Sequence, residues 1–311
     1  MGNYLITGGC GFIGSTLIEK LISNGSKLFV IDNLSTGKIS NLPKSKKITF
    51  LKKSVQNIDD FNIDKLDGIF HLAAQTSVPK SIDNFYESTS NNLLSSMKIF
   101  DFAVKNLVPI VYASSSAVYG NLKLGSEKIE NYDIISPYAQ DKLTMEHYSK
   151  MIFKVYDLPS IGLRFFNVYG PKQDPNNPYS GVISIFINNL LKGQPIIING
   201  GYQTRDFIYI DNIVSTMIIS MEVLKKRKIC EVLNVGTGIS ITINNLLKQL
   251  INISKTNPEI INKELPDGDP EKSAGNYEKL KMILGIDIST FVNINAGLNK
   301  TFEYCKNIKL L

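Results

Sequence analysis

The stretch Thr7-Gly8-Gly9-Cys10-Gly11-Phe12-Ile13-Gly14 decides the fold class of this 311-residue chain. Its glycines at positions 8, 11 and 14 follow a short apolar run at 4–6 and precede a helical pattern over about 12–24. Glycines allow close approach to the backbone, and a helix start offers unpaired N–H groups and a positive dipole end to a pyrophosphate. A glycine triplet alone could be a plain turn, but between a strand and a helix it favours a dinucleotide-binding unit.

The acidic residue Asp32 directly follows the next apolar run, 28–31. At this distance from Gly14, a carboxylate accepts hydrogen bonds from an adenosine ribose and repels a 2′-phosphate. The alternative is an ordinary turn residue. The spacing favours the first interpretation, and we therefore predict NAD as the cofactor.

Short apolar runs alternate with helical patterns through the first two-thirds of the chain. We expect strands at 48–51, 68–72, 109–113, 160–165 and 208–210, and long helices at about 84–106 and 138–155. This alternation predicts an α/β fold, a doubly wound (Rossmann) parallel sheet whose ligands lie beyond the carboxyl ends of the strands. We predict an NAD-binding domain from 1–165 plus about 206–234, and a smaller C-terminal substrate lobe from about 166–205 and 235–311.

Composition points to an ordinary globular enzyme, with 43% hydrophobic and 20% charged residues. The net charge of +6 is spread along the chain without the basic, aromatic-interleaved stripe of nucleic-acid-binding proteins. Cys10, Cys230 and Cys305 lack metal-ligand spacing, which indicates reduced thiols and no metal site. No membrane-length apolar run or signal-peptide pattern is present, so we expect a cytoplasmic protein without nucleic-acid or membrane partners.

A serine, a tyrosine and a lysine form the candidate catalytic group. Ser136 and Pro137 suit the cap and first turn of a helix, which places Tyr138 and Lys142 on one helical face. An ammonium beside a phenol should lower the pKa of the phenol from about 10 towards neutrality. Ser115 follows the predicted strand 109–113, at the sheet edge where a ligand should lie.

Seven segments carry a family resemblance: TGGCGFIGS (7–15), VIDNLSTG (30–37), FHLAAQTSV (70–78), YASSSAVYG (112–120), SPYAQDK (136–142), RFFNVYGP (164–171) and QTRDFIYIDNI (203–213). With them the chain resembles the extended short-chain dehydrogenase/reductase family, and within it the UDP-glucose and UDP-N-acetylglucosamine 4-epimerases. The resemblance covers nearly the whole chain.

The resemblance implies roles for individual residues. The catalytic residues would be Ser115, Tyr138 and Lys142. The NAD-binding residues would be Gly8, Gly11, Phe12, Ile13, Gly14, Asp32, Asn33, Leu34, Ser35, Thr36, Gly37, Ser54, Val55, Leu72, Ala73, Ala74, Gln75, Thr76, Asn92, Tyr138, Lys142, Phe165 and Phe166. The substrate-binding residues would be Ser77, Ser115, Ser116, Asn167, Val182, Arg205 and Ser273, with Arg205 meeting the phosphates of the nucleotide.

The implied reaction is a reversible oxidation of the sugar. Tyr138, kept deprotonated by Lys142, takes the proton of the 4-hydroxyl while Ser115 orients that oxygen. Hydride passes from C4 to the nicotinamide, the 4-keto sugar turns over, and hydride returns to its other face while NAD stays bound.

The two residues after Ser115 separate the activities that share this scaffold. Resembling 4,6-dehydratases place Asp-Glu there and decarboxylases usually keep the Glu, whereas this chain has Ser116 and Ala117, which cannot serve as general acids. This favours a 4-epimerase over a 4,6-dehydratase or a 4-dehydrogenase/reductase. A non-catalytic NAD-binding regulatory protein is a further alternative, but such proteins usually lose the tyrosine or the lysine.

Substrate identity depends on positions where the chain departs from the family. The small Ser273 stands where a bulky tyrosine restricts glucose-specific epimerases, which predicts an N-acetylated hexosamine as substrate. The expected phosphate-binding arginine is Pro266, a usual aspartate is Asn276, and the aspartate beside the adenine is Ser54. Arg205 and the nearby Lys272 remain as cations, and the base could be guanine or thymine instead of uracil.

Two other features carry expectations. The helices at about 84–106 and 138–155 match the pair that relatives pack into a dimeric four-helix bundle, which predicts a homodimer. His71, at a strand end, is interpreted as a hydrogen-bonded core histidine.

Overall fold

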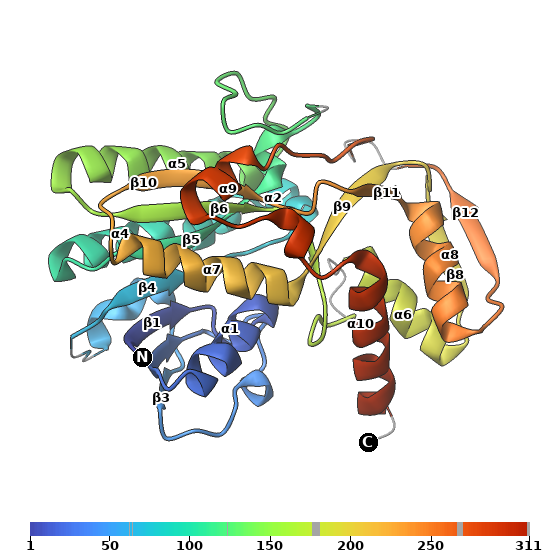
Figure 1. Ribbon diagram of the computed structural model, residues 1–311, viewed down its shortest axis with the longest axis horizontal. Helices are drawn as coiled ribbons and strands as arrows, with labels where there is room; N and C mark the ends of the chain where they lie inside the picture. Colours follow the sequence, from blue (N-terminus) through green and yellow to red (C-terminus); the bar gives the residue numbers. More distant parts are fainter. Residues whose placement is uncertain (62, 64, 123, 176–180, 266–269, 310–311) are drawn as a thin grey trace.

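A parallel sheet forms the centre of the larger lobe (Figure 1). The computed structural model describes the chain except residues 62, 64, 123, 176–180, 266–269 and 310–311, and in this part seven strands pair in the order β3-β2-β1-β4-β5-β6-β10. Their bounds are β1 Asn3–Thr7, β2 Lys27–Ile31, β3 Ile48–Leu51, β4 Gly68–His71, β5 Ile110–Ser115, β6 Ser160–Phe165 and β10 Cys230–Val235. The order reverses between β1 and β4, where a doubly wound sheet opens a ligand crevice. The predicted fold class is confirmed.

Helices cover both faces of this sheet, which explains why its strands are continuous apolar runs. α1 (Phe12–Ser23) and α7 (Ile210–Leu224) pack together on one face, and α4 (Ser95–Asn106) and α5 (Pro137–Tyr156) pack on the other. At the start of α5 the Ser136 hydroxyl accepts the backbone N–H of Ala139, with Pro137 in the first turn as expected. The predicted strand 208–210 is shifted, because Ile210 already begins α7.

The expected helix at about 84–106 changes its hydrogen bonding along its length. It follows α2 (Val78–Asp83) and comprises α3 (Phe85–Thr89), the π-helical turn η3 (Ser90–Leu94) and α4. π-helical turns inside helices often mark functional sites, and this one carries Asn92.

The smaller lobe is built around two short sheets. β7 (Asn167–Tyr169), β9 (Thr204–Tyr209) and β11 (Ser240–Thr242) form one, and β8 (Ile196–Asn199) pairs with β12 (Ile260–Lys263) in the other. The helices α6 (Val182–Lys192), α8 (Ile243–Ser254) and α10 (Ile294–Lys309) pack together in this part, whereas α9 (Glu278–Leu284) packs against β10 and α7 of the larger lobe (Figure 1). Within the described ranges of the chain, the short 3-10 helices are η1 (Ile39–Asn41), η2 (Val55–Asp60), η4 (Ser116–Tyr119) and η5 (Ile288–Thr290). We propose that the boundary between the two lobes lies where the chain leaves the carboxyl ends of β6 and β10.

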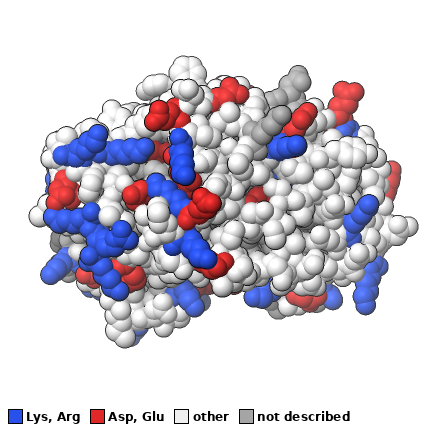
Figure 2. All heavy atoms as spheres, turned by 45° about the horizontal axis from the view of Figure 1, so that its top comes forward, with Lys and Arg blue, Asp and Glu red and all other residues white. Residues whose placement is uncertain are grey.

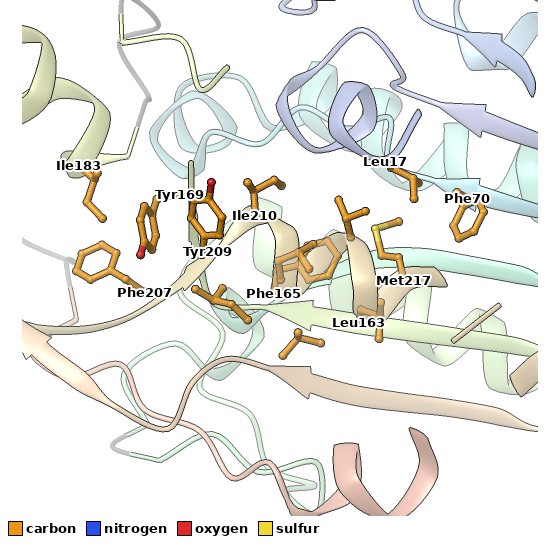
Figure 3. Packing of buried hydrophobic residues seen from close by; sticks show 14 of the residues in the cluster. Leu17, Phe70, Leu163, Phe165, Tyr169, Ile183, Phe207, Tyr209, Ile210 and Met217 are labelled. Carbon is orange, nitrogen blue, oxygen red and sulfur yellow. The ribbon is translucent and has the colours of Figure 1, made fainter. Parts of the chain in front are cut away.

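One hydrophobic core joins the two lobes. In Figure 3 it runs from Leu17 and Phe70, beside the central sheet, past Phe165 to Tyr169 and Phe207 in the smaller lobe. Because these side chains belong to one buried cluster, the two lobes are packed against each other as a unit.

The molecular surface carries charges of both signs. Figure 2 shows acidic side chains among the lysines and arginines of one face, with most charges over the larger lobe. Among the described residues, no helix is both long and apolar enough to cross a bilayer.

Candidate active site

The glycine-rich turn between β1 and α1 is too tightly packed to accept side chains. Gly8 has a φ of +69°, and a Cβ added to it would lie 2.7 Å from the backbone nitrogen of Ala73. A Cβ on Gly14 would lie 2.3 Å from the carbonyl oxygen of Gly8. The turn therefore presents bare backbone at the start of α1, as a pyrophosphate-binding turn requires.

Asp32 lies beside this turn at the end of β2. Its two carboxylate oxygens accept the backbone N–H groups of Cys10 at 2.9 Å and of Leu34 at 2.8 Å. Each oxygen has a second lone pair, so the carboxylate can also accept ribose hydroxyls. A Cβ on Gly37 would lie 3.1 Å from one of these oxygens, so the loop 33–37 passes close to the carboxylate. Together with the glycine turn, these residues fit a dinucleotide.

A buried hydrogen-bond chain anchors the end of β4 next to the glycine turn. The Thr7 hydroxyl accepts the N–H groups of Leu72 and Ala73, both at 3.1 Å, and therefore donates to Nδ1 of His71 at 2.7 Å. Nε2 of His71 then donates to Ser96 at 2.9 Å. Burial and the Lys142 charge lower the pKa of His71 to about 3, so the ring is neutral. The interpretation of His71 as a hydrogen-bonded core histidine is confirmed.

Asn92 holds the predicted cofactor segment 72–76 in place. Its side-chain oxygen accepts the Gln75 N–H at 2.7 Å, and its amide nitrogen donates to the Gln75 carbonyl at 3.1 Å. The Gln75 side chain in turn bonds the backbone of Ser77, the N-cap residue of α2. The π-helical turn therefore fixes the loop after β4.

The structure brings Ser115, Tyr138 and Lys142 together on β5 and α5. The Ser115 hydroxyl accepts the N–H of Ala117 at 3.1 Å and hydrogen-bonds the Tyr138 phenol. Lys142 Nζ donates to the Ala113 carbonyl at 2.7 Å and lies 5.8 Å from the centre of the Tyr138 ring. Tyr138 and Lys142 are both buried.

The expected lowering of the Tyr138 pKa is wrong. Burial raises the pKa of Tyr138 and outweighs the opposing hydrogen bond with Ser115. Burial also lowers the pKa of Lys142 to about 8, against the opposing charges of Asp141 and Glu146. Desolvation thus dominates both residues, because each lies where water cannot stabilise its charged form.

Sequence reasoning missed a buried ion pair behind the catalytic group. The Arg164 guanidinium on β6 binds both carboxylate oxygens of Glu146 on α5, at 2.8 and 2.6 Å. Glu146 also accepts the Ser114 hydroxyl, and Arg164 donates to Tyr119 and Tyr132. The available signal was an arginine inside the otherwise apolar run 160–165.

Asp206 on β9 is a second buried charge that sequence reasoning missed. It is fully buried and accepts the N–H groups of Thr237 and Gly238 and the Tyr277 hydroxyl, the last at 2.6 Å. Its carbonyl oxygen accepts the Asn167 side chain at 3.3 Å. Asp206 therefore joins the predicted substrate-binding strands to the segment before α9.

The predicted substrate-binding residues of the smaller lobe lie along β9 and the segment beside it. Arg205 donates to the carbonyl of Pro270 at 2.7 Å, and Lys272 pairs with Thr204 next to it, so both cations lie at the start of β9. The backbone N–H of Ser273 donates to the Thr204 carbonyl, and the Ser273 carbonyl accepts the Ser240 hydroxyl. Two residues further on, a Cβ on Gly275 would lie 2.6 Å from the Phe166 ring, so this segment packs against a predicted cofactor contact.

Other predicted residues lie at the edges of the site. Val182 begins α6, Ser116 begins η4, and Ser54 caps η2 by accepting the N–H of Gln56. Phe165 packs in the main core beside Met217 (Figure 3), and its backbone pairs with Ser115 in the sheet. Pro266 and the Gly268-Asp269 pair lie outside the described residues.

Comparisons with known proteins agree with this geometry. A model of the NAD dependent epimerase/dehydratase family matches residues 4–236. A putative UDP-glucose 4-epimerase of Methanocaldococcus jannaschii is 31% identical over 310 residues, covering 97% of this chain and 98% of its own. The UDP-glucose 4-epimerase of Thermotoga maritima, solved with UDP-glucose, is similar with a TM-score of 0.92, 35% identity and 99% coverage of both chains. For the UDP-N-acetylglucosamine 4-epimerase of Methanobrevibacter ruminantium M1, solved with UDP-N-acetylmuramic acid, the TM-score is 0.88, at 33% identity and 99% coverage of both chains.

Proposed function

The chain belongs to the NAD-dependent epimerase/dehydratase family, and from this premise we propose that it is a nucleotide-sugar 4-epimerase. NAD is its cofactor. The observation that carries the choice of reaction is the Ser115, Tyr138 and Lys142 group, followed by Ser116 and Ala117 in place of acidic residues.

The residues of the chain divide the proton chemistry at C4 between them. Ser115 orients the sugar 4-hydroxyl and stabilises the Tyr138 phenolate through its hydrogen bond. Below a pH of about 8 Lys142 is an ammonium, and its charge near the phenol favours the same anion. Tyr138 then takes the proton from the 4-hydroxyl and later returns it. When bound, NAD supplies the hydride acceptor and donor.

Each of the α5 carboxylates near the catalytic group binds another residue through at least one oxygen, which favours epimerisation over dehydration. A 4,6-dehydratase needs a further acid to protonate the leaving hydroxyl at C6. Glu146 is bound to Arg164 and Ser114, and Asp141 accepts the Thr89 hydroxyl at 2.9 Å. Along η4, which continues from Ser115, the sequence Ser116–Tyr119 offers no carboxylate.

A panel of UDP-, GDP- and dTDP-sugars, analysed by NMR at C4 and C6, tests the reaction. We expect inverted C4 with intact C6 for at least one sugar pair. Tyr138→Phe should lower kcat by about 10²–10⁴-fold, the usual contribution of acid–base catalysis, whereas Tyr148→Phe, an exposed position on the same helix, should retain activity. A 6-deoxy-4-keto product would identify a dehydratase, and net NADH formation a dehydrogenase.

For the substrate we propose a UDP-N-acetylhexosamine pair. Ser273 is small, and Gly275 of the same segment packs against Phe166. A bulky side chain at position 273 would therefore take up space beside the sugar. Ser273→Tyr should therefore lower kcat/KM for the N-acetylated pair at least tenfold and spare the UDP-glucose pair. Ser289→Tyr on η5 is the matched control. Equal activity of Ser273→Tyr on both pairs would contradict the assignment.

We further propose that the protein is a homodimer. Exposed apolar side chains gather on α5 and on the helices packed against it: Ile82, Phe85, Tyr86, Leu94, Tyr148, Met151, Val155 and Tyr156. We call this set the α5 face. An exposed apolar area of this kind is typical of an interaction surface.

A further inference from the structure

The Glu146–Arg164 ion pair connects the elements that carry the catalytic residues. Glu146 lies one turn after Lys142 on α5, and Arg164 precedes Phe165 at the end of β6. Ser114, which donates to Glu146, directly precedes Ser115 on β5. Both charged side chains are at most 2% exposed. One carboxylate therefore ties α5 to β5 and β6 just behind the reacting groups.

The Glu146–Arg164 pair is buried, and removing its two charges from water costs free energy that a surface ion pair does not cost. A buried ion pair contributes little net stability compared with apolar residues of similar size. Here Glu146 accepts from Ser114 and twice from Arg164, and Arg164 makes two more bonds, at 2.7 Å to Tyr119 and at 2.9 Å to Tyr132. Both oxygens of the buried Glu146 carboxylate are therefore held by hydrogen-bond donors of β5 and β6.

Taking the proposed epimerase reaction as given, we propose that Glu146 is a positioning residue: its carboxylate, anchored by Arg164, aligns α5 with β5 and keeps Lys142 in the ammonium form that the reaction needs.

Two carboxylates on α5, first Asp141 and then Glu146, oppose the fall of the Lys142 pKa. On α5 the ammonium is faced by Tyr138, Asp141 and Glu146, and on β4 by His71, which is neutral. Burial raises the pKa of Asp141, so its charge is itself disfavoured. Glu146 is the carboxylate that a buried cation compensates.

The Lys142 pKa determines how the loss of Glu146 changes the charge of Lys142. Burial has already lowered it to about 8, and the carboxylates of Asp141 and Glu146 oppose that fall. Without Glu146 the pKa of Lys142 drops further, so a larger fraction of the side chain is neutral near pH 8. The Tyr138 phenolate then loses its cationic neighbour.

The test follows the titration of Lys142 directly, by ¹³C NMR of labelled lysine in the NAD-loaded protein, with Lys142→Met to assign the signal. Glu146→Gln keeps the shape and removes the charge, and should lower the Lys142 midpoint by roughly one pH unit. Because this leaves Arg164 unpaired, Glu146→Gln with Arg164→Met serves as a second variant without an unpaired buried ion. Ser114→Ala, which removes a hydrogen bond but no charge, is the matched control.

The proposal predicts a lower Lys142 midpoint in both variants lacking the carboxylate and an unchanged midpoint in Ser114→Ala. The alkaline limb of the kcat–pH profile should move with the midpoint while KM changes little. An unchanged midpoint in a folded Glu146→Gln or double variant would overturn the proposal. The titration needs no turnover, so it stands even if the wild type inverts no sugar, a result that would overturn only the proposed function.

Discussion

At the scale of single residues, Lys142 shows how burial and chemistry oppose each other. Its side chain is 5% exposed, and burial lowers its pKa from 10.5 to about 8. Between these two values the unfolded chain holds a proton that the folded chain does not. Stability therefore rises as the pH rises through this window, since the folded protein no longer buries an ammonium.

Replacing Lys142 by Met removes this dependence on pH. Relative to Lys142→Met, the wild type should gain about 3 kcal/mol of unfolding free energy between pH 8 and pH 10.5. Below pH 8 the difference between the two proteins should be constant. Urea unfolding of both proteins at pH 7, 8, 9 and 10 measures it, with the exposed Lys150→Met as control. A difference that does not change with pH would mean that Lys142 titrates normally when folded.

Residue spacing was sufficient to predict that Ser115, Tyr138 and Lys142 lie together, but not to predict their electrostatics. Tyr138 and Lys142 are four residues apart on a capped helix, and Ser115 ends a strand, so local rules place all three. The direction of the Tyr138 pKa depends on how much water reaches the phenol, which is a property of the packed fold. Arg164 was overlooked for a related reason, since its partner Glu146 comes from a helix that only the fold brings near.

At the scale of elements, the turn into α1 depends on glycine where the backbone comes closest to itself. Gly14→Ala would push a methyl group to 2.3 Å from the Gly8 carbonyl, so the turn must open. We expect NAD binding, measured by calorimetry, to weaken at least tenfold, about 1.4 kcal/mol.

Gly181→Ala at the start of α6 is the matched control. Gly181 has an ordinary φ of −62°, and its nearest neighbour is the flexible Gln173 side chain, so NAD affinity should be retained. Unchanged NAD affinity in Gly14→Ala would contradict the assignment of this turn to the pyrophosphate.

Helix and strand positions followed from apolar periodicity, whereas their local hydrogen bonding did not. The pattern over 84–106 predicted a helix, and the backbone is helical from Phe85, but the sequence Ser90–Leu94 gives no local sign of a π-helical turn. That turn places Asn92 against Gln75, a contact between segments far apart in the chain. Likewise, the sequence pattern places Ile210 at the end of a strand. In the structure β9 ends at Tyr209, and Ile210 is the first residue of α7.

At the scale of the whole molecule, we propose that the α5 face is the contact surface of a homodimer. Met151 and Val155, both exposed on α5, would be covered in the proposed homodimer. Met151→Glu with Val155→Glu should convert a dimer into a monomer of 34.6 kDa in light scattering. Ile239→Glu, at an exposed position after β10, should leave the mass unchanged. A wild type that is monomeric at micromolar concentration would contradict the dimer.

In the proposed reaction, the same hydride leaves and returns to C4 within one protein molecule. The most direct measurement uses a UDP-sugar carrying deuterium at C4, incubated with the protein without added NAD, with the product analysed by NMR. We expect a C4-inverted sugar that retains the deuterium at C4 and has an intact C6. Loss of the deuterium to solvent, or a product altered at C6, would contradict it.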